Sequence, residues 1–266
     1  MATDPVADLT RAMRLSLETA GLARKEDGGS VYFAGGGRPG APLLLLLHGT
    51  NDQAGTWARV VPMLTRKYRL IVPDLAGHGD SRPLSGPIPI PLVIERLHQI
   101  VEREEARDLT IAGNSFGAWI AILYTLAHPD RVQQLVLESG GGLSRPLAVP
   151  LVARDRKTAM TILRAVHGPN YVPQEWVIDA LLARANDSPA LRLTEAMENL
   201  VDARLPEIKV PATLVWGAND GVLPLPYAEA LRDGIAGAQL HVIEDAAHIP
   251  HLQQPEKFVQ CLTATS

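Results

Sequence analysis

The sequence predicts an α/β fold with a mostly parallel central sheet, flanked by helices and carrying a small helical cap. Short apolar runs with the length of buried strands alternate with longer helical patterns over most of the chain. Strands that are apolar throughout indicate a parallel sheet covered on both faces. The alternation then stops between about residues 141 and 206, where helical patterns follow one another.

The first predicted element is a helix from residue 5 to about residue 23. Asp4 is placed to cap it, and Pro5 suits the first helical turn, where a backbone N–H is not required. Apolar residues recur along it at helical spacing, namely Leu9, Met13 and Leu17. We expect this helix to pack on the core as an addition to the alternating pattern.

A strand, SVYFAG, is predicted next, and the glycine-rich run after it is turn material. Six further runs have strand length: LLLLLHG (43–49), YRLIVPDL (68–75), LTIAGNS (109–115), VQQLVLES (132–139), PATLVWG (211–217) and AQLHVIE (238–244). Helical patterns separate the early ones: TWARVVPMLTRKY, IPLVIERLHQIVEREEA and GAWIAILYTLAHPD.

The segment 141–206 contains three helical patterns and no evident strand: PLVARDRKTAMTILRAVHG, PQEWVIDALLARA and ALRLTEAMENLVDA. This segment reads as a helical cap inserted after the strand that ends near Ser139. We therefore expect an α/β core formed by residues 1–140 and 207–266, with residues 141–206 as the cap.

Composition narrows the range of partners. The 266 residues carry a formal net charge of −4 without a basic stripe, which argues against nucleic acid or an anionic membrane. The one cysteine, Cys261, cannot form an internal disulfide, so a reducing compartment fits. The N-terminal residues lack an apolar signal core, and the run APLLLLL (41–47) is too short to span a bilayer. We expect a cytoplasmic protein that binds a small molecule, as a monomer or a homodimer.

The stretch LTIAGNSFGAWIAIL (109–123) places a serine between two glycines at a predicted strand-to-helix turn. A tight turn of this kind holds its middle residue, Ser115, in a strained conformation with the hydroxyl exposed. Small residues are needed at Gly113 and Gly117 because neighbouring backbone passes close to them. Ser115 is therefore the predicted nucleophile, and an ordinary turn serine is the alternative.

A serine hydroxyl needs a base, and the base needs an orienting carboxylate. Asp220 lies in the loop ANDGVLP after one predicted strand, and His248 lies in the loop that follows the last strand. Both loops leave the C-terminal edge of the sheet, where open α/β folds build their sites. We expect Ser115, Asp220 and His248, in this chain order, to form a catalytic triad.

Together with the triad, the motif LLLLHG followed by VPDLAGHGDS (72–81) resembles the α/β-hydrolase family, and the resemblance covers nearly the whole chain. In that family, the residue after His-Gly and the residue after the serine donate backbone N–H groups to the oxyanion. The resemblance thus implies Thr50 and Phe116 as oxyanion donors, and it implies acyl transfer without a cofactor. Related dehalogenases and epoxide hydrolases carry aspartate where this chain has Ser115.

Other polar residues near these motifs have competing interpretations. Glu138, at the end of the strand LVLES, is an alternative acid for the histidine, while Asp245 is expected to cap a turn. His251 makes an HxxH pair with His248, but without an HExxH pattern no metal site is predicted. The remaining motif residues are expected to fix loops or fill the core: His48, His78, Asp74, Asp80, Trp119 and Trp216.

The leading functional hypothesis is hydrolysis of carboxylic esters, including lactones or thioesters, through an acyl-enzyme on Ser115. The elbow GNSFG, the loop HGTNDQAGTW and the cap sequence ILRAVHGPNYVPQEWVIDALLARA also resemble C–C bond hydrolases that cleave ring-fission products. Cleavage of vinylogous 1,5-diketone acids is therefore the alternative, and a ligand-binding protein on a hydrolase scaffold is the third hypothesis. The first two share the triad, so the cap pocket must decide between them.

Three residues are predicted to contact the substrate. Asn114 adjoins the serine and Ile249 follows the histidine. Arg184 resembles the cap arginine that holds the substrate carboxylate in the C–C hydrolases. Arg156 and Arg164 are further candidates for binding an acid, although exposed helix charges are the alternative interpretation. A basic pocket would favour the diketone acid, and an apolar pocket would favour a neutral ester.

Overall fold

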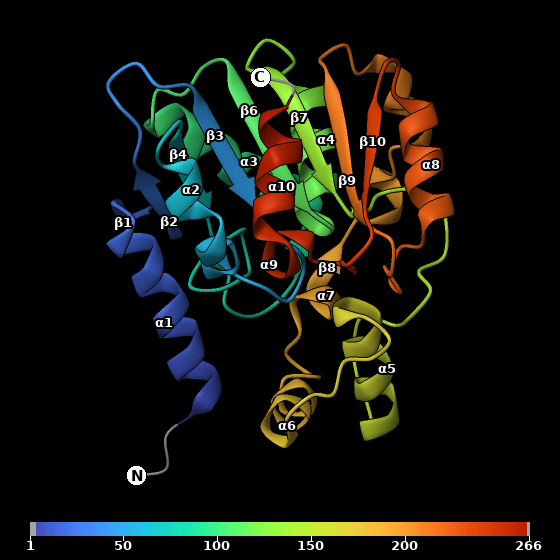
Figure 1. The fold of residues 1–266 in the computed structure, drawn as a ribbon. Coiled ribbons are helices and arrows are strands. Elements are labelled where there is room, and N and C mark those ends of the chain that lie inside the picture. Colours follow the sequence, from blue (N-terminus) through green and yellow to red (C-terminus); the bar gives the residue numbers. More distant parts are fainter. Residues whose placement is uncertain (1–3, 265–266) are drawn as a thin grey trace.

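The computed structural model describes residues 4–264 and contains an eight-stranded sheet in the order β1-β2-β4-β3-β6-β7-β9-β10 (Figure 1). The strands from β4 to β10 in this order run parallel, whereas the β1–β2 and β2–β4 pairs are antiparallel. The predicted mostly parallel sheet is therefore confirmed. The strands are β1 (Leu22–Asp27), β2 (Ser30–Gly35), β3 (Leu43–Leu47), β4 (Arg69–Pro73), β6 (Leu109–Asn114), β7 (Val132–Glu138), β9 (Ala212–Gly217) and β10 (Gln239–Ile243).

Alternate residues of the central strands face two separate apolar layers, because successive side chains of a strand point to opposite faces. Leu45 and Leu47 of β3 belong to the layer that includes α3 (Ile90–Arg103), α4 (Phe116–Ala127) and α8 (Leu225–Gly234). Leu44 and Leu46 belong to the opposite layer. That layer includes α1 (Pro5–Thr19), α2 (Val61–Leu64) and α10 (Pro255–Thr263).

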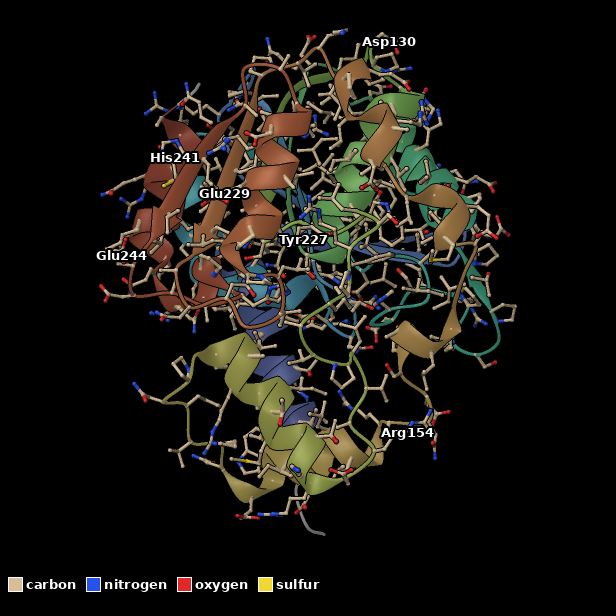
Figure 2. All side chains as sticks on the ribbon, turned by 90° about the vertical axis from the view of Figure 1, so that its right-hand side faces the viewer. Asp130, Arg154, Tyr227, Glu229, His241 and Glu244 are labelled. Atoms are coloured by element: carbon tan, nitrogen blue, oxygen red, sulfur yellow. The ribbon has the colours of Figure 1, made fainter. Side chains whose placement is uncertain are left out.

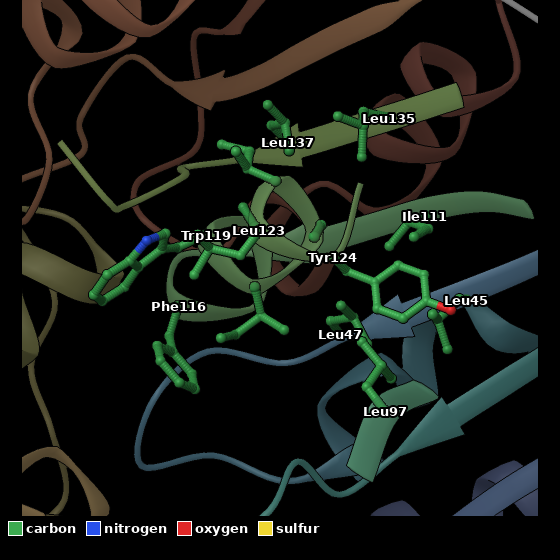
Figure 3. Close-up of a cluster of buried hydrophobic side chains, with 14 of the residues drawn as sticks. Leu45, Leu47, Leu97, Ile111, Phe116, Trp119, Leu123, Tyr124, Leu135 and Leu137 are labelled. Carbon is green, nitrogen blue, oxygen red and sulfur yellow. The ribbon is translucent and has the colours of Figure 1, made fainter. Parts of the chain in front are cut away.

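The helix α4 packs its apolar side chains directly on the parallel strands (Figure 3). Leu123 and Tyr124 of α4 lie in the same cluster as Ile111 of β6 and Leu135 of β7. All four side chains are buried, so this contact removes a large apolar area from water and fixes α4 on the sheet. The N-terminus of α4 is thereby held at the carboxyl end of β6.

The N-terminal helix is shorter than expected. It ends at Thr19, and after a turn at Gly21 the chain forms β1, an edge strand that the sequence did not indicate. β1 buries its first residue and exposes the rest, so it lacks the apolar pattern of a buried strand. Within α1, Leu17 is buried but Leu9 is 50% exposed, because the beginning of the helix extends away from the sheet (Figure 1).

Two predicted helices are interrupted. Pro62 cannot donate a backbone hydrogen bond, and the expected helix before β4 is divided into a 3-10 helix, η1 (Ala54–Arg59), and the four-residue α2. The last helical pattern of the segment 141–206 forms only α7 (Pro189–Arg192) before the chain becomes extended at β8 (Leu193–Thr194). The expectation of no strand in this segment is wrong, because β8 pairs in parallel with β5 (Ile88–Pro89). Two 3-10 helices follow, η2 (Met197–Asn199) and η3 (Asp202–Glu207).

Residues 141–206 are called the cap segment below. Its two longer helices, α5 (Arg156–His167) and α6 (Glu175–Ala183), lie beside the end of the sheet from which the loops after β9 and β10 emerge (Figures 1 and 2). They enclose an apolar cluster of their own, formed by Ala153, Ala159, Ile162, Leu163 and Ile178. The cap segment thus has a small core of its own, and other residues of it are buried against the layer that contains α3, α4 and α8, among them Leu143, Ala165, Val201 and Leu205.

The predicted core begins and ends with residues that lie outside the described part of the chain, namely 1–3 and 265–266. Between residues 4 and 264, no helix combines the length and the apolar character needed to cross a membrane.

Arg14 joins α1 to the loops that follow β3 and β4. Its Nη2 lies 2.6 Å from Asp74 Oδ2, its Nη1 contacts Asp80, and its Nε donates to Gln53 Oε1 at 3.0 Å. Asp74 is buried and also accepts the backbone N–H groups of Ala54 and Asp80 at 2.7 and 2.8 Å. A buried carboxylate requires such partners, so Arg14 is the cation that makes the position of Asp74 tolerable.

Replacing Arg14 by alanine is expected to lower the free energy of unfolding by about 3 kcal/mol, because it leaves the buried Asp74 without its cation. Arg11 is the matched control, since its side chain is 78% exposed and its ion pair with Asp8 spans 3.7 Å. Arg11→Ala should change the unfolding free energy by less than about 0.5 kcal/mol. Urea denaturation followed by circular dichroism measures both, and equal stability of the two variants would contradict this role of Arg14.

Candidate active site

Ser115 lies between the end of β6 and the start of α4. Its backbone has φ 52° and ψ −111°, which residues other than glycine rarely adopt. The Ser115 N–H donates to the Glu138 carbonyl at 2.8 Å, and the Ser115 carbonyl accepts the N–H groups of Trp119 and Gly141 at 3.2 and 3.1 Å. Such a conformation costs about 1–3 kcal/mol and persists only where the surroundings impose it. These three hydrogen bonds impose it here.

The two glycines of the serine motif are required by the packing of the turn. A Cβ on Gly113 would lie 2.4 Å from the carbonyl carbon of Gly117, and a Cβ on Gly117 would lie 2.2 Å from Leu47 O. Both distances are far below van der Waals contact, so a side chain does not fit at either position. The spacing that singles out Ser115 in the sequence therefore has a steric cause in the fold.

Asp220 and His248 meet across the loops that follow β9 and β10. His248 Nδ1 lies 2.9 Å from Asp220 Oδ2 and 3.1 Å from Oδ1. Asp220 Oδ1 also accepts the backbone N–H groups of Val222 and Leu223, both at 2.9 Å. The carboxylate favours the imidazole tautomer with its proton on Nδ1, which leaves Nε2 as the basic nitrogen.

Asn114 connects this pair to Ser115. Its amide donates to the His248 carbonyl at 3.0 Å and so holds the histidine loop against the end of β6. Within residues 4–264, the Ser115 hydroxyl and His248 Nε2 have no hydrogen-bond partner. Both groups are therefore free for a substrate, and contacts of this kind often tighten only when one is bound.

The alternative acid, Glu138, is committed to a different histidine. Glu138 Oε2 lies 2.7 Å from His251 Nδ1, and Oε1 accepts the His251 backbone N–H at 2.6 Å. His251 Nε2 contacts the Thr56 hydroxyl at 3.0 Å, and its ring lies on Trp57 with the centroids 4.2 Å apart. The HxxH pair is thus divided between two carboxylates, and the carboxylate that reaches His248 is Asp220.

Thr50 and Phe116, the expected oxyanion donors, lie at two loop ends beside Ser115. The loop of Thr50 comes close, since a Cβ on Gly49 would lie 3.5 Å from Ser115 Cβ. Phe116 is the first residue of α4, so its N–H has no carbonyl partner within the helix. In the described part of the chain, the N–H groups of Thr50 and Phe116 donate no hydrogen bond. Two unpaired N–H groups beside a serine can bind negative charge on a substrate oxygen.

Two histidines hold the loops around these donors, as expected. His48 Nε2 accepts the Leu75 N–H at 2.9 Å, and His78 Nδ1 lies 3.1 Å from the Ala76 carbonyl. Burial, followed by the proximity of His48, lowers the pKa of His78 to about 3, so this side chain is neutral near pH 7. The ring of His78 stacks on Phe116 with the centroids 5.6 Å apart.

Of the three predicted substrate contacts, Asn114 and Ile249 lie together, since the Asn114 amide reaches the carbonyl of the residue before Ile249, whereas Arg184 lies in the cap segment. Asn114 is buried and its amide links β6 to the histidine loop, while its contact with the substrate stays a prediction. Ile249 is buried and directly precedes the short helix α9 (Pro250–Gln253). Arg184 is exposed at the end of α6, and its guanidinium has no partner among the described residues.

The other cap arginines are also exposed or engaged. Arg156 forms a surface ion pair, and Arg164 is exposed. Arg154 lies at the outer edge of the cap segment (Figure 2). Arg192 donates to three backbone carbonyls of the loop 77–86. Among the described cap residues, therefore, no arginine is both buried and unpaired.

Two polar residues beside Thr50 and His248 have a structural part that the sequence does not reveal. Asn51 follows Thr50, and its side chain is bonded to the cap segment. Gln253 lies in α9, and its side chain is bonded to the residue before His248. Both are polar loop or helix-end residues whose partners are distant in the chain, so no local pattern marks them.

Comparison with known proteins gives consistent matches. The family model described as Alpha/beta hydrolase family matches residues 44–260. A 2-hydroxy-6-oxononadienedioate/2-hydroxy-6-oxononatrienedioate hydrolase of Escherichia coli (strain K12 / DH10B) is 27% identical over 286 residues, covering 98% of this chain and 97% of that protein.

Solved structures agree in fold. A membrane phospholipase A has a TM-score of 0.79 at 26% identity, covering 96% of this chain and 92% of that one. An enol-lactonase from Burkholderia xenovorans LB400 has a TM-score of 0.74 at 21% identity, covering 91% and 98%. The second likeness shows the fold alone.

Proposed function

The chain belongs to the alpha/beta hydrolase family, and on this premise we propose that it hydrolyses neutral carboxylic esters, lactones or thioesters through an acyl-enzyme on Ser115. The observation that carries the proposal is the Asp220–His248 contact of 2.9 Å. The loop that carries His248 is bonded to Asn114, which ends β6 and directly precedes the strained Ser115.

In the proposed mechanism, His248 Nε2 takes the proton of Ser115 as the serine oxygen attacks the substrate carbonyl carbon. Asp220 orients the imidazole and stabilises the imidazolium that forms. The oxyanion of the tetrahedral intermediate accepts the N–H groups of Thr50 and Phe116, and in other enzymes one such donor contributes about 3–4 kcal/mol. His248 then gives its proton to the leaving alcohol, and water releases the acid from the acyl-enzyme by the same steps.

The charges near the site support a neutral substrate. The described cap arginines are exposed or engaged with backbone, so none is placed to neutralise a buried carboxylate. Burial lowers the pKa of His167 in the cap segment, and the negative charge of Asp52, two residues after Thr50, partly opposes this effect.

Cleavage of a C–C bond in a vinylogous diketone acid is the second candidate. One specific observation favours it, the 27% identity to the E. coli hydrolase over 98% of the chain. By its name, that protein acts on a dioic acid, and a site for such a substrate needs a cation that this cap segment does not offer among its described residues. We therefore place ester hydrolysis first.

A comparison of p-nitrophenyl butyrate with 2-hydroxy-6-oxononadienedioate tests this order. We expect kcat/KM for the ester to exceed that for the dioate by about a hundredfold or more, because an unpaired buried charge costs about 3 kcal/mol. Initial rates on both substrates with the same enzyme preparation give this ratio. A higher kcat/KM for the dioate would reverse the assignment.

A further inference from the structure

The last turn of α5 is bonded to the loops that carry Asp220 and His248. The last carbonyl groups of a helix have no partner within it. Here the Ala165 carbonyl accepts the Gly221 N–H at 3.0 Å, and the Val166 carbonyl accepts the His248 N–H at 3.1 Å. The end of a cap helix therefore contacts the backbone of the histidine and of the residue after the aspartate.

Gln253 extends this contact through its side chain. Its Nε2 donates to the His167 carbonyl at 2.7 Å, and its Oε1 accepts the Ala247 N–H at 2.7 Å. Ala247 directly precedes His248. One amide group thus bridges the end of α5 and the backbone that leads into the histidine.

Asn51 makes the equivalent connection on the oxyanion side. Its Nδ2 donates to the Leu151 carbonyl at 3.2 Å, and its Oδ1 accepts the Ser188 hydroxyl at 2.6 Å and the Ala190 N–H at 3.2 Å. All three partners belong to the cap segment. The backbone of Asn51 has φ 62°, a left-handed conformation that asparagine tolerates better than most residues.

These contacts reach the two groups whose orientation the reaction depends on most. The direction of the Thr50 N–H follows from the backbone that Asn51 anchors, and the position of the His248 ring follows from the backbone that Gln253 and Val166 anchor. A displacement of about 1 Å in such groups can lower a rate about a hundredfold. The cap helices α5 and α6 enclose a separate apolar cluster, and Ala165 in the last turn of α5 also packs on the core layer of α4 and α8, next to these polar bonds.

We propose that Asn51 and Gln253 are positioning residues through which the docked cap segment completes the active site. Asn51 fixes the oxyanion loop, and Gln253 fixes the histidine loop. The inference rests on the proposed function, since it assigns to both residues a part in the same serine chemistry. It makes the cap segment a part of the catalytic framework.

The variants Asn51→Gly and Gln253→Ala test the proposal. Glycine is chosen at position 51 because it removes the side chain while accepting the positive φ. Each variant is expected to lower kcat for p-nitrophenyl butyrate about 10- to 100-fold while KM changes less than about threefold, the pattern of a lost transition-state interaction. Gln253→Glu keeps the acceptor for the Ala247 N–H and should recover part of the rate.

Two matched controls separate positioning from a general loss of amide groups. Gln254 neighbours Gln253 and its Nε2 donates at 3.3 Å to the Asp245 carbonyl in the same loop as His248, but it makes no bond to the cap segment and so isolates the part that depends on the cap segment. Asn199 uses its Nδ2 within the cap segment, on the Glu195 carbonyl at 2.6 Å. Gln254→Ala and Asn199→Ala should retain the wild-type kcat. All four alanine or glycine variants should melt within about 5 °C of the wild type.

A double-mutant cycle tests the Asn51 connection itself. Ser188→Ala removes the donor to Asn51 Oδ1, so it should lower kcat in the wild type but add little to Asn51→Gly. Losses that multiply in the double variant would mean that the two residues act independently, which would overturn the connection.

Labelling of Ser115 by a fluorophosphonate, a reagent for activated serines, distinguishes the two levels of the argument. If the reagent labels the wild type, and both Asn51→Gly and Gln253→Ala keep the wild-type kcat, only this inference is overturned. Equal losses in the two control variants would also overturn it. Absence of both labelling and ester hydrolysis in the wild type would overturn the proposed function, and this inference with it.

Discussion

Replacing Ser115 by alanine is expected to lower kcat for p-nitrophenyl butyrate by about a thousandfold or more, the size of loss seen when a triad nucleophile is removed. The reason is that the acyl-enzyme has no other oxygen on which to form. A residual rate would come from direct attack of water on the substrate, with the N–H groups of Thr50 and Phe116 stabilising the oxyanion that forms. Initial rates at matched protein concentration measure the loss.

Ser139 provides a matched control for this substitution. It directly follows the neighbouring strand β7 and also has a positive φ, 45°, but its hydroxyl is buried without a hydrogen-bond partner among the described residues. Ser139→Ala should therefore keep a rate close to that of the wild type. Equal rates in wild type and Ser115→Ala would show that Ser115 is an ordinary turn serine.

Replacing Asp220 by asparagine is expected to lower kcat by about 10⁴-fold, because the amide favours the wrong tautomer of His248. The structure has a built-in comparison, since Glu138 holds His251 in the same way that Asp220 holds His248. Glu138→Gln should leave kcat within about an order of magnitude of the wild type, because Glu138 does not contact His248. The two carboxylates thus have distinct expected effects.

The free energy of unfolding should fall more in Glu138→Gln than in Asp220→Asn, the opposite order to the losses of kcat. Glu138 and His251 are fully buried, and Gln at position 138 leaves one buried group without its best partner, a loss of about 1–3 kcal/mol in unfolding free energy. Kinetics and urea denaturation on both variants complete the test. A large loss of kcat in Glu138→Gln together with an active Asp220→Asn would exchange the roles of the two acids.

Several parts of the fold could be predicted because their causes are local in the chain. The mainly apolar runs of β3, β6 and β9 mark strands buried on both faces, and all three appear at the expected places. The serine motif could be recognised because only glycine fits at positions 113 and 117. A Cβ on Gly113 would collide with the backbone of Gly117, and a Cβ on Gly117 would collide with the backbone of β3. β1 escaped detection because an exposed edge strand has no apolar alternation.

The division of the chain at residues 141–206 stays a prediction, as do the catalytic roles of Ser115, Asp220 and His248. The order of these residues and their places after strands could be inferred from sequence, because parallel strands deliver their following loops to one edge of the sheet. Which carboxylate at that edge bonds to which histidine could not be inferred from the sequence. Glu138 ends one strand and Asp220 follows another, and the sequence allows either carboxylate to bond to His248.

By itself, then, the sequence determined the parallel sheet, the strained serine turn and the set of residues collected at one edge. Only the tertiary structure decided that Asp220 pairs with His248 and Glu138 with His251, that Asn114 is a link, and that Arg14, Asn51 and Gln253 bind loops far away in the chain. The physical reason is one of range. Strand periodicity and steric exclusion act between near neighbours, whereas the choice of hydrogen-bond partner depends on distances that exist only after the chain has folded.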